Sequence, residues 1–325
     1  MSVLSKPYMH DEAAAFAHVE SILWADGPVC PHCGVVDRAY RLEGVRTKPS
    51  KKNPDGKERF GLWKCRECRK QFTVRKGTIF EESHIEMHKW LQAIHLMVSS
   101  KKGISAHQLH RVLEITHKSA WFMAHRIREA MRSDGAVDFG SGGGAVEVDE
   151  TFIGNDRTVK PHGSKKGRGY AHKHKLLTLV DRNTGRAKSM VVDDLKTATL
   201  LPILQENIAK EAVVYTDEAG QYKFLSRDFA GHDFVRHGQG EYGRGSVHTN
   251  TIEGYFSIFK RGMKGVYQHC AKKHLHRYAA EFEFRYNNRA AHEIDDMNRS
   301  VILLRSTSGK RLTYAGPDAA QPEAI

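Results

Sequence analysis

Two short apolar runs of this chain each end in an aspartate, and this repetition constrains the fold more than any other feature. Asp149 ends the alternating stretch AVEVD, and Asp217 ends the valine-rich stretch AVVYTD. Short runs rich in β-branched residues favour β-strands. An acid directly after an apolar strand is typical of the sites that α/β sheets build at their strand ends. The sequence therefore predicts two strands that bring carboxylates to one sheet.

A third acid lies on a predicted helix. Glu253 stands near the start of an amphipathic segment, with 35 residues between it and Asp217, and Lys260 follows it by seven positions. Seven positions are two helical turns, so both side chains share one face. Three such carboxylates can hold two Mg²⁺ (or Mn²⁺) ions that clamp the attacking and leaving oxygens of a phosphoryl transfer. We predict Asp149, Asp217 and Glu253 as metal-binding catalytic residues, with Lys260 contacting substrate phosphate.

The residues before Glu253 leave a structural alternative open. Asn250-Thr-Ile-Glu253 fits a capping box, in which Asn250 caps the helix and Glu253 satisfies a backbone N–H. One carboxylate cannot easily do this and bind a metal. The position of Lys260 on the same helical face favours the metal-binding interpretation.

Four of the five cysteines fall in two close pairs, Cys30-Pro-His-Cys33 and Cys65-Arg-Glu-Cys68. Four thiolates close a tetrahedron around Zn²⁺ and leave no open position for chemistry, so we predict one structural zinc. The 31 residues between the pairs include a basic stretch, 48–60, predicted as an exposed hairpin or loop. The alternatives are ordinary buried cysteines or an iron–sulfur site. Cys270 stands alone and is predicted as a packing residue.

The sequence pattern divides the rest of the chain. We predict a short helix over 11–24 within residues 1–28, and a zinc ribbon over residues 29–80. Residues 84–132 are predicted to form three helices, with caps at Ser105 and Thr116. The last two helices make a helix-turn-helix candidate, with a plain helical connector as the alternative. Its outward face would present four residues to DNA: His117, Lys118, Arg126 and Arg128.

A glycine-rich stretch, 133–144, predicts the linker to a second domain over 145–306. Three strands, a helix and a fourth strand follow, then loop-rich residues 226–247 and three more helices, which together predict an α/β fold with a mixed sheet. The expected elements are strands at 145–153, 175–182, 187–194 and 212–217, and helices at 195–211, 250–263, 273–289 and 295–306. The tail 308–325 is predicted to be disordered.

The charge balance points to a polyanionic partner. Lys plus Arg exceed Asp plus Glu by 51 − 38 = 13, and each phosphate contact releases counterions and adds salt-dependent affinity. A basic protein with no nucleic-acid role is the alternative. No run approaches 18 apolar residues and the first 25 lack a signal-peptide apolar region, so we expect a cytoplasmic protein without a membrane span.

Four longer motifs carry a resemblance to a known family. They are VEVDETFIG (146–154), YTDEAGQY (215–222), HTNTIEGYFSIFKRGMKGVYQH (248–269) and HLHRYAAEFEFRYNNR (274–289). With the order of ribbon, helices and acidic domain, the chain resembles DDE transposases of bacterial insertion sequences, in the branch with an N-terminal zinc ribbon, from about residue 10 to 290. The resemblance implies an RNase H-like catalytic domain with the triad Asp149, Asp217 and Glu253, followed by Lys260. Some members carry asparagine as third ligand, which keeps Asn250 as an alternative.

The resemblance also implies an activity. Such an enzyme binds the inverted repeats at transposon ends, cuts them, and joins the exposed 3′-OH to target DNA. Since two ends must be joined, a homodimer or higher oligomer on DNA is expected. Two alternatives remain open, a non-catalytic DNA-binding protein derived from a transposase and a hydrolytic nuclease of the same fold.

Overall fold

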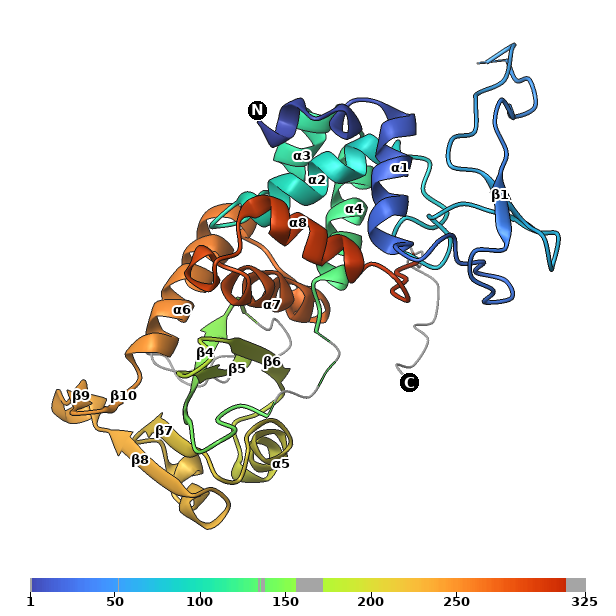
Figure 1. Ribbon diagram of the computed structural model, residues 1–325. Helices are drawn as coiled ribbons and strands as arrows, with labels where there is room; N and C mark the ends of the chain where they lie inside the picture. Colours follow the sequence, from blue (N-terminus) through green and yellow to red (C-terminus); the bar gives the residue numbers. More distant parts are fainter. Residues whose placement is uncertain (1, 52, 134, 136–137, 156–171, 314–325) are drawn as a thin grey trace. The chain divides into compact units, whose positions relative to one another are not determined.

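The computed structural model describes residues 2–51, 53–133, 135, 138–155 and 172–313 (Figure 1). The chain divides into two compact units. Unit 1 comprises Met1–Ser100, Ile104–Met131 and Ile294–Ile325, and unit 2 comprises Lys101–Gly103 and Arg132–Glu293. No helix within the described residues combines the length and apolar character needed to cross a membrane. Most of the predicted tail, residues 314–325, lies outside the described residues.

Unit 1 is built largely of capped helices. Asp11 accepts the backbone N–H of Ala14 at 2.7 Å, Ser105 forms a full capping box with Gln108, and Thr116 caps the following helix. Side-chain acceptors of this kind satisfy the free N–H groups of a first helical turn, and all three caps were predictable from residue type. The helices are α1 (Glu12–Leu23), α2 (Met87–Ser99), α3 (Ala106–Leu113), α4 (His117–Ala130) and α8 (Asp296–Arg305), with short turns at Val3–Ser5 and Pro7–Met9.

The last of these helices, α8, departs from the predicted domain order. Sequence places residues 295–306 at the end of the acidic domain, whereas the structure packs α8 against α1 and α2 of unit 1. Arg299 Nη1 donates to the carbonyl oxygen of Val98 at 2.8 Å, and Leu303 and Leu304 are buried. An apolar stripe predicts that a helix is buried but does not identify the surface that buries it.

The zinc-ribbon region forms a small antiparallel sheet of β1 (Ala39–Arg41), β2 (Trp63–Cys65) and β3 (Gln71–Phe72). Trp24, which ends α1, packs edge-on against Trp63 and Phe72 with ring centroids 6.0 and 5.8 Å away. The expected hairpin is present, since backbone bridges join Arg46 to Glu58 and Ser50 to Asn53.

Unit 2 contains a five-stranded mixed sheet in the order β6-β5-β4-β7-β8. The first three strands of this sheet along the chain, β4 to β6, are antiparallel neighbours, while β7 and β8 run parallel to β4. The mixed sheet confirms the α/β fold with a mixed sheet that the sequence predicted. The strands are β4 (Ala145–Ile153), β5 (His174–Asp181), β6 (Ala187–Val192), β7 (Val213–Asp217) and β8 (Gly231–Val235).

Helices cover both faces of this sheet (Figure 1). Val146 and Val148 of β4 pack with Leu204 in a core on the α5 side, whereas Ile153 packs with Phe259 in a core on the α6 and α7 side. Because side chains alternate along a strand, Asp149 faces α6 and Glu150 faces α5. The helices are α5 (Thr197–Asn207), α6 (Asn250–Gly262), continued by a π-helical turn (Met263–Tyr267), and α7 (Lys272–Asn287).

The segment 226–247, predicted to be rich in loops, also contains the edge strand β8, which the sequence did not predict. The sequence of this strand, GHDFV, buries only Val235 and leaves its other residues partly exposed. An edge strand with one solvated side lacks the apolar run by which strands are recognised. A short hairpin follows, made of β9 (Gly243–Arg244) and β10 (Val247–His248).

A buried acid on α7 makes stability depend on pH. Burial raises the pKa of Glu283 to about 7, although the Ser189 N–H that it accepts and Lys188 act to lower it. The folded state thus binds this proton more tightly than the unfolded chain, and stability falls as pH rises from about 4 to 7. We expect Glu283→Gln to be more stable than wild type at pH 8, by up to about 3 kcal/mol. Urea denaturation at pH 8 and pH 4 checks this, with equal stabilities expected at pH 4.

Candidate active site

The two predicted aspartates lie on neighbouring parallel strands. In the register of β4 and β7, Glu147 stands opposite Tyr215, and Asp149 and Asp217 each follow that pair by two residues. Side chains two residues apart on a strand share a face. The sheet therefore brings both aspartates to the same level on the face that α6 covers.

The environment of Asp149 strongly favours its protonated form. The pKa of the Asp149 carboxyl is raised to about 7, chiefly by burial and also by the negative charges of Glu150 and Asp217. The backbone N–H of Glu150 and the charge of Lys260 act in the opposite direction. Asp149 therefore lies within the electrostatic reach of both Asp217 and Lys260, and a bound cation would favour its ionised form.

The adjacent acid, Glu150, has a separate role on the other face of the sheet. Its Oε1 accepts hydrogen bonds from the Tyr222 hydroxyl and from Gln221 Nε2, the latter at 3.1 Å. Burial raises the pKa values of both Glu150 and Tyr222. Glu150 therefore belongs to the core beneath α5, and Asp149 is the acid of this pair that faces α6.

A third acid of the same strand, Glu147, anchors the helix that carries Glu253. Its side chain is fully buried. Its Oε2 accepts the backbone N–H of Ile252 at 2.8 Å, and its Oε1 accepts the Thr251 hydroxyl at 2.8 Å. The guanidinium of Arg182 pairs with it at 2.6 Å. The first turn of α6 is therefore fixed directly to β4, two residues before Asp149.

The capping box that the sequence left open as an alternative at the start of α6 is absent. The helix begins at Asn250, its N-cap is Thr249, and no side chain caps it. The Thr249 hydroxyl instead donates to Glu253 Oε1 at 3.3 Å. Glu147 already accepts the Ile252 N–H, so this N–H needs no capping side chain from the helix itself. The Glu253 carboxylate does not cap the helix.

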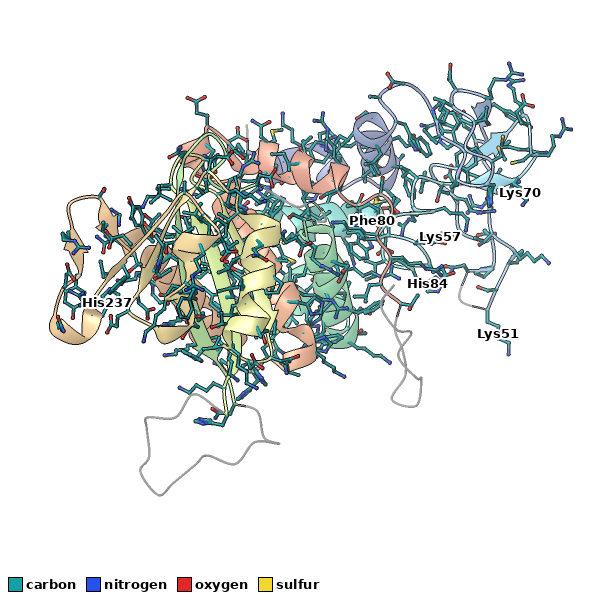
Figure 2. The ribbon with its side chains drawn as sticks, turned by 90° about the horizontal axis from the view of Figure 1, so that it is seen from below. Lys51, Lys57, Lys70, Phe80, His84 and His237 are labelled. Atoms are coloured by element: carbon teal, nitrogen blue, oxygen red, sulfur yellow. The ribbon has the colours of Figure 1, made fainter. Side chains whose placement is uncertain are left out.

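A histidine from the segment after β8 approaches Glu253. His237 Nε2 lies 3.5 Å from Glu253 Oε1. Glu218, the residue after Asp217, holds this segment by accepting the backbone N–H groups of His237 and Gly238 at 2.8 and 2.9 Å. The Gly238 N–H, with His237, lowers the pKa of Glu218. Sequence could not place His237 (labelled in Figure 2) beside Glu253, because β8, which leads to it, was not predicted.

The three predicted ligands do not form a single compact cluster. Among the described residues, only the four cysteines bring three or more ligand atoms within 4.8 Å of one another. The carboxylates of Asp149, Asp217 and Glu253 therefore stand farther apart than such a cluster allows. Lys260, whose Nζ lies 5.7 Å from the Phe256 ring centroid, extends from the same helix as Glu253.

The cysteine pairs converge as predicted. The Sγ atoms of Cys30 and Cys68 are 3.6 Å apart, and those of Cys33 and Cys65 are 3.7 Å apart. A tetrahedral zinc with Zn–S bonds of about 2.3 Å has S···S edges of roughly 3.8 Å, so the four thiols fit one structural Zn²⁺. Cys270 packs against the α6 and α7 core instead, in agreement with its predicted role.

Two of the four residues predicted to face DNA from α4 are buried instead. Arg126 is 6% exposed and donates to two backbone carbonyl groups of the segment before α2, at 2.8 and 2.7 Å. Arg128 is 2% exposed. The prediction for these arginines is wrong because the second half of α4 is buried on nearly every side. His117 and Lys118, in the exposed first turn, keep the predicted position.

Comparison with known protein families agrees with this architecture. Residues 142–287 match the ISXO2-like transposase domain, and residues 10–71 match the transposase zinc-ribbon domain. Over these two regions the chain is similar to insertion-sequence transposases with an N-terminal zinc ribbon.

Individual relatives extend the comparison. A protein in transposable element ISH50 of Halobacterium salinarum is 27% identical over 275 residues, which cover 81% of this chain and 87% of that protein. A transposase-like protein of Haemophilus influenzae is 29% identical over 100 residues, or 31% of this chain and 80% of that protein. A chain of the simian T-cell lymphotropic virus intasome in complex with PP2A regulatory subunit B56 gamma, solved by cryo-EM, matches at 12% identity. Its TM-score is 0.27, over 54% of this chain and 67% of that one.

Proposed function

We propose that Asp149, Asp217 and Glu253 hold two Mg²⁺ (or Mn²⁺) ions, with which this transposase cuts transposon ends and joins them to target DNA. The observation that carries the proposal is the pair of aspartates on adjacent parallel strands, on the sheet face covered by the helix that bears Glu253 and Lys260. In such a site the ions polarise the scissile phosphate and generate the nucleophile.

Two ions rather than one follow from the two-metal chemistry of phosphoryl transfer, and the spacing of the acids is compatible with it. Carboxylates that do not share a single compact cluster fit a pair of ions about 3.5–4 Å apart, each bound by part of the set. The raised pKa of Asp149 supports a cation as its partner, because a buried carboxylate is otherwise costly to ionise. Lys260, whose charge reaches Asp149, is placed to contact the phosphate that the ions bind.

A basic depression on the outer side of α6 supports a path for the DNA backbone. Lys101, Lys102 and Arg261 line a hollow of about 320 Å³ together with Ile258. The connector carrying the lysines belongs to the same unit as α6 and packs closely on it, since a Cβ at Gly262 would meet the Lys102 carbonyl oxygen at 2.7 Å. Clustered cations of this kind bind phosphates without reading base sequence.

The basic depression yields a salt-dependence prediction. We expect Lys101→Gln combined with Arg261→Gln to weaken binding equally for specific and random DNA. Loss of two phosphate contacts should reduce the slope of log affinity against log salt by roughly 2. Lys196→Gln is the control, because this exposed lysine precedes α5 on the opposite face of the sheet. Fluorescence anisotropy from 50 to 300 mM salt, roughly the range in which such contacts dominate, measures the slope. An unchanged slope excludes the contact.

We assign recognition of the inverted repeats to unit 1. Exposed cations support this assignment, with Lys51, Lys57 and Lys70 on the zinc-ribbon region (Figure 2) and His117 and Lys118 at the start of α4. The helix-turn-helix role of α3 and α4 rests on their short connection, in which Glu114 adopts a left-handed conformation. Since two ends must be joined, we expect a dimer or higher oligomer on DNA.

One assay tests the proposed activity directly. Labelled DNA carrying the inverted repeats that flank the coding region is incubated with Mg²⁺ and a plasmid target. Cut ends together with labelled joined plasmid are the expected products. Cut ends without joining would identify a hydrolytic nuclease, and binding without cutting would identify a DNA-binding protein derived from a transposase.

A further inference from the structure

One guanidinium in unit 2 contacts both strands that carry a predicted aspartate ligand, and also the segment that leads into α6, the helix of Glu253. Arg182, in the turn after β5, donates from Nε to Glu147 Oε1 at 2.6 Å and from Nη1 to the Ser246 carbonyl oxygen at 2.6 Å. Its Nη2 donates to His248 Nδ1 at 2.8 Å. Its charged group also lies 4.5 Å from the centroid of the Tyr215 ring. These contacts reach β4, β7 and the segment that leads into α6.

The contacts fall at matching positions relative to the acids. Glu147 precedes Asp149 by two residues, and Tyr215 precedes Asp217 by two residues. A spacing of two keeps each pair on the same face of its strand. Arg182 therefore contacts Glu147 and Tyr215, the side chains that precede the two aspartates on the same face of the sheet.

The helix bearing Glu253 depends on the same pair of residues. Glu147 accepts the backbone N–H of Ile252 and the hydroxyl of Thr251, while Arg182 holds the His248 carbonyl oxygen just before the helix. No side chain caps α6. The carboxylate and the guanidinium together thus fix both the entry into α6 and its first turn.

We propose that Arg182 and Glu147 are positioning residues, which set the distances between Asp149, Asp217 and Glu253 without touching the ions or DNA. The inference rests on the proposed function, in which these acids bind metal. Groups behind a metal site that orient its ligands typically change metal affinity 10–100-fold when replaced. Glu147 thus acts on the ligands indirectly, through its contacts with α6 and with Arg182.

A second buried pair in the same unit provides a matched control. Glu281 of α7 is also fully buried and pairs with Arg285, while its Oε1 accepts the Tyr267 hydroxyl. These contacts join α7 to the π-helical turn after α6. Glu281→Gln therefore removes a buried charge of the same kind without disturbing the start of α6.

The experiment uses the full-length, zinc-loaded protein and two independent measurements. Mn²⁺ affinity is measured by isothermal titration, and amide hydrogen exchange over residues 250–254 is measured without divalent ions. We expect Glu147→Gln and Arg182→Gln to weaken Mn²⁺ binding roughly 10–100-fold and to accelerate this exchange, while Glu281→Gln changes neither. A glutamine at position 147 places an NH₂ group, itself a donor, against groups that donated hydrogen bonds to the Glu147 carboxylate, so some of these hydrogen bonds are lost.

Arg182→Lys keeps the design informative should the neutral variants fold poorly. A lysine retains the charge opposite Glu147 but cannot also reach Ser246 and His248 with a planar fork. We expect Mn²⁺ binding between that of wild type and Arg182→Gln. Wild-type Mn²⁺ affinity and exchange in Glu147→Gln, or equal losses in Glu281→Gln, would overturn the positioning role. If the wild-type protein binds no Mn²⁺, or if Asp149→Asn does not abolish the binding, the proposed metal site is wrong. Hydrogen exchange alone then decides how α6 is held.

Discussion

Replacement of Asp217 by asparagine is expected to abolish Mg²⁺-dependent cutting and joining while leaving the binding of transposon ends intact. Asp217 ends β7 beside Asp149, where a neutral amide can neither neutralise nor hold a divalent ion as a carboxylate does. Because bound ions contribute several kcal/mol to phosphoryl transfer, the rate should fall by roughly 10³-fold or more. Single-turnover cleavage of labelled end DNA measures the loss, and a mobility-shift assay on the same DNA measures binding.

The controls for this prediction separate a metal ligand from an acid of the same charge. Asp233→Asn removes a half-exposed carboxylate on the edge strand β8, where it pairs with Arg244, and should cleave at the wild-type rate. Glu253→Gln should behave as Asp217→Asn does. Cleavage at the wild-type rate in Asp217→Asn would remove this residue from the site.

The third ligand is decided by a second comparison. Asn250 is exposed at the first position of α6 and caps nothing, so Asn250→Ala should keep full cleavage. The opposite pattern, in which Asn250→Ala is inactive and Glu253→Gln is active, would move the third ligand to Asn250. Because neither residue is needed to cap the helix, either loss of activity reports on chemistry rather than on folding.

Local pattern was sufficient wherever the deciding interaction is close in sequence. Ser105 and Thr116 cap the helices that follow them, and the paired cysteines meet in space. The acids of the two valine-rich strands were visible for the same reason, although only Asp217 ends its strand, whereas Asp149 lies in the middle of β4. In each case residue type and spacing over a few positions determine the structure.

Sequence pattern failed where the partner is distant. Arg126 looks solvent-exposed by type, yet it satisfies carbonyl groups more than 40 positions away. Glu147 looks like one more surface acid beside Asp149, yet its partners lie 35 and more residues along the chain. One signal was available for Glu147. It shares the strand face of Asp149, so an acid there requires either solvent or a buried cation.

Removal of zinc is expected to unfold the ribbon and abolish specific end binding, while the proposed metal site of unit 2 keeps its Mn²⁺ affinity. The apolar core of the ribbon is small, with Cys30, Cys65 and Phe72 as its buried members. Zinc binding by such a module contributes about 10–16 kcal/mol, which is essentially its folding energy. Chelation or Cys65→Ser should therefore separate Trp24 from Trp63, whose rings pack edge-on.

Three measurements together make this prediction specific. Near-UV circular dichroism follows the tryptophan pair, anisotropy follows binding to end DNA and to random DNA, and titration follows Mn²⁺. Cys270→Ser is the control, since this thiol packs in the core of unit 2 and should leave one zinc per chain. End-specific binding that survives with zinc removed and the tryptophan signal lost would contradict the assignment. Recognition of the inverted repeats would then rest on α3 and α4, whose caps do not depend on the metal.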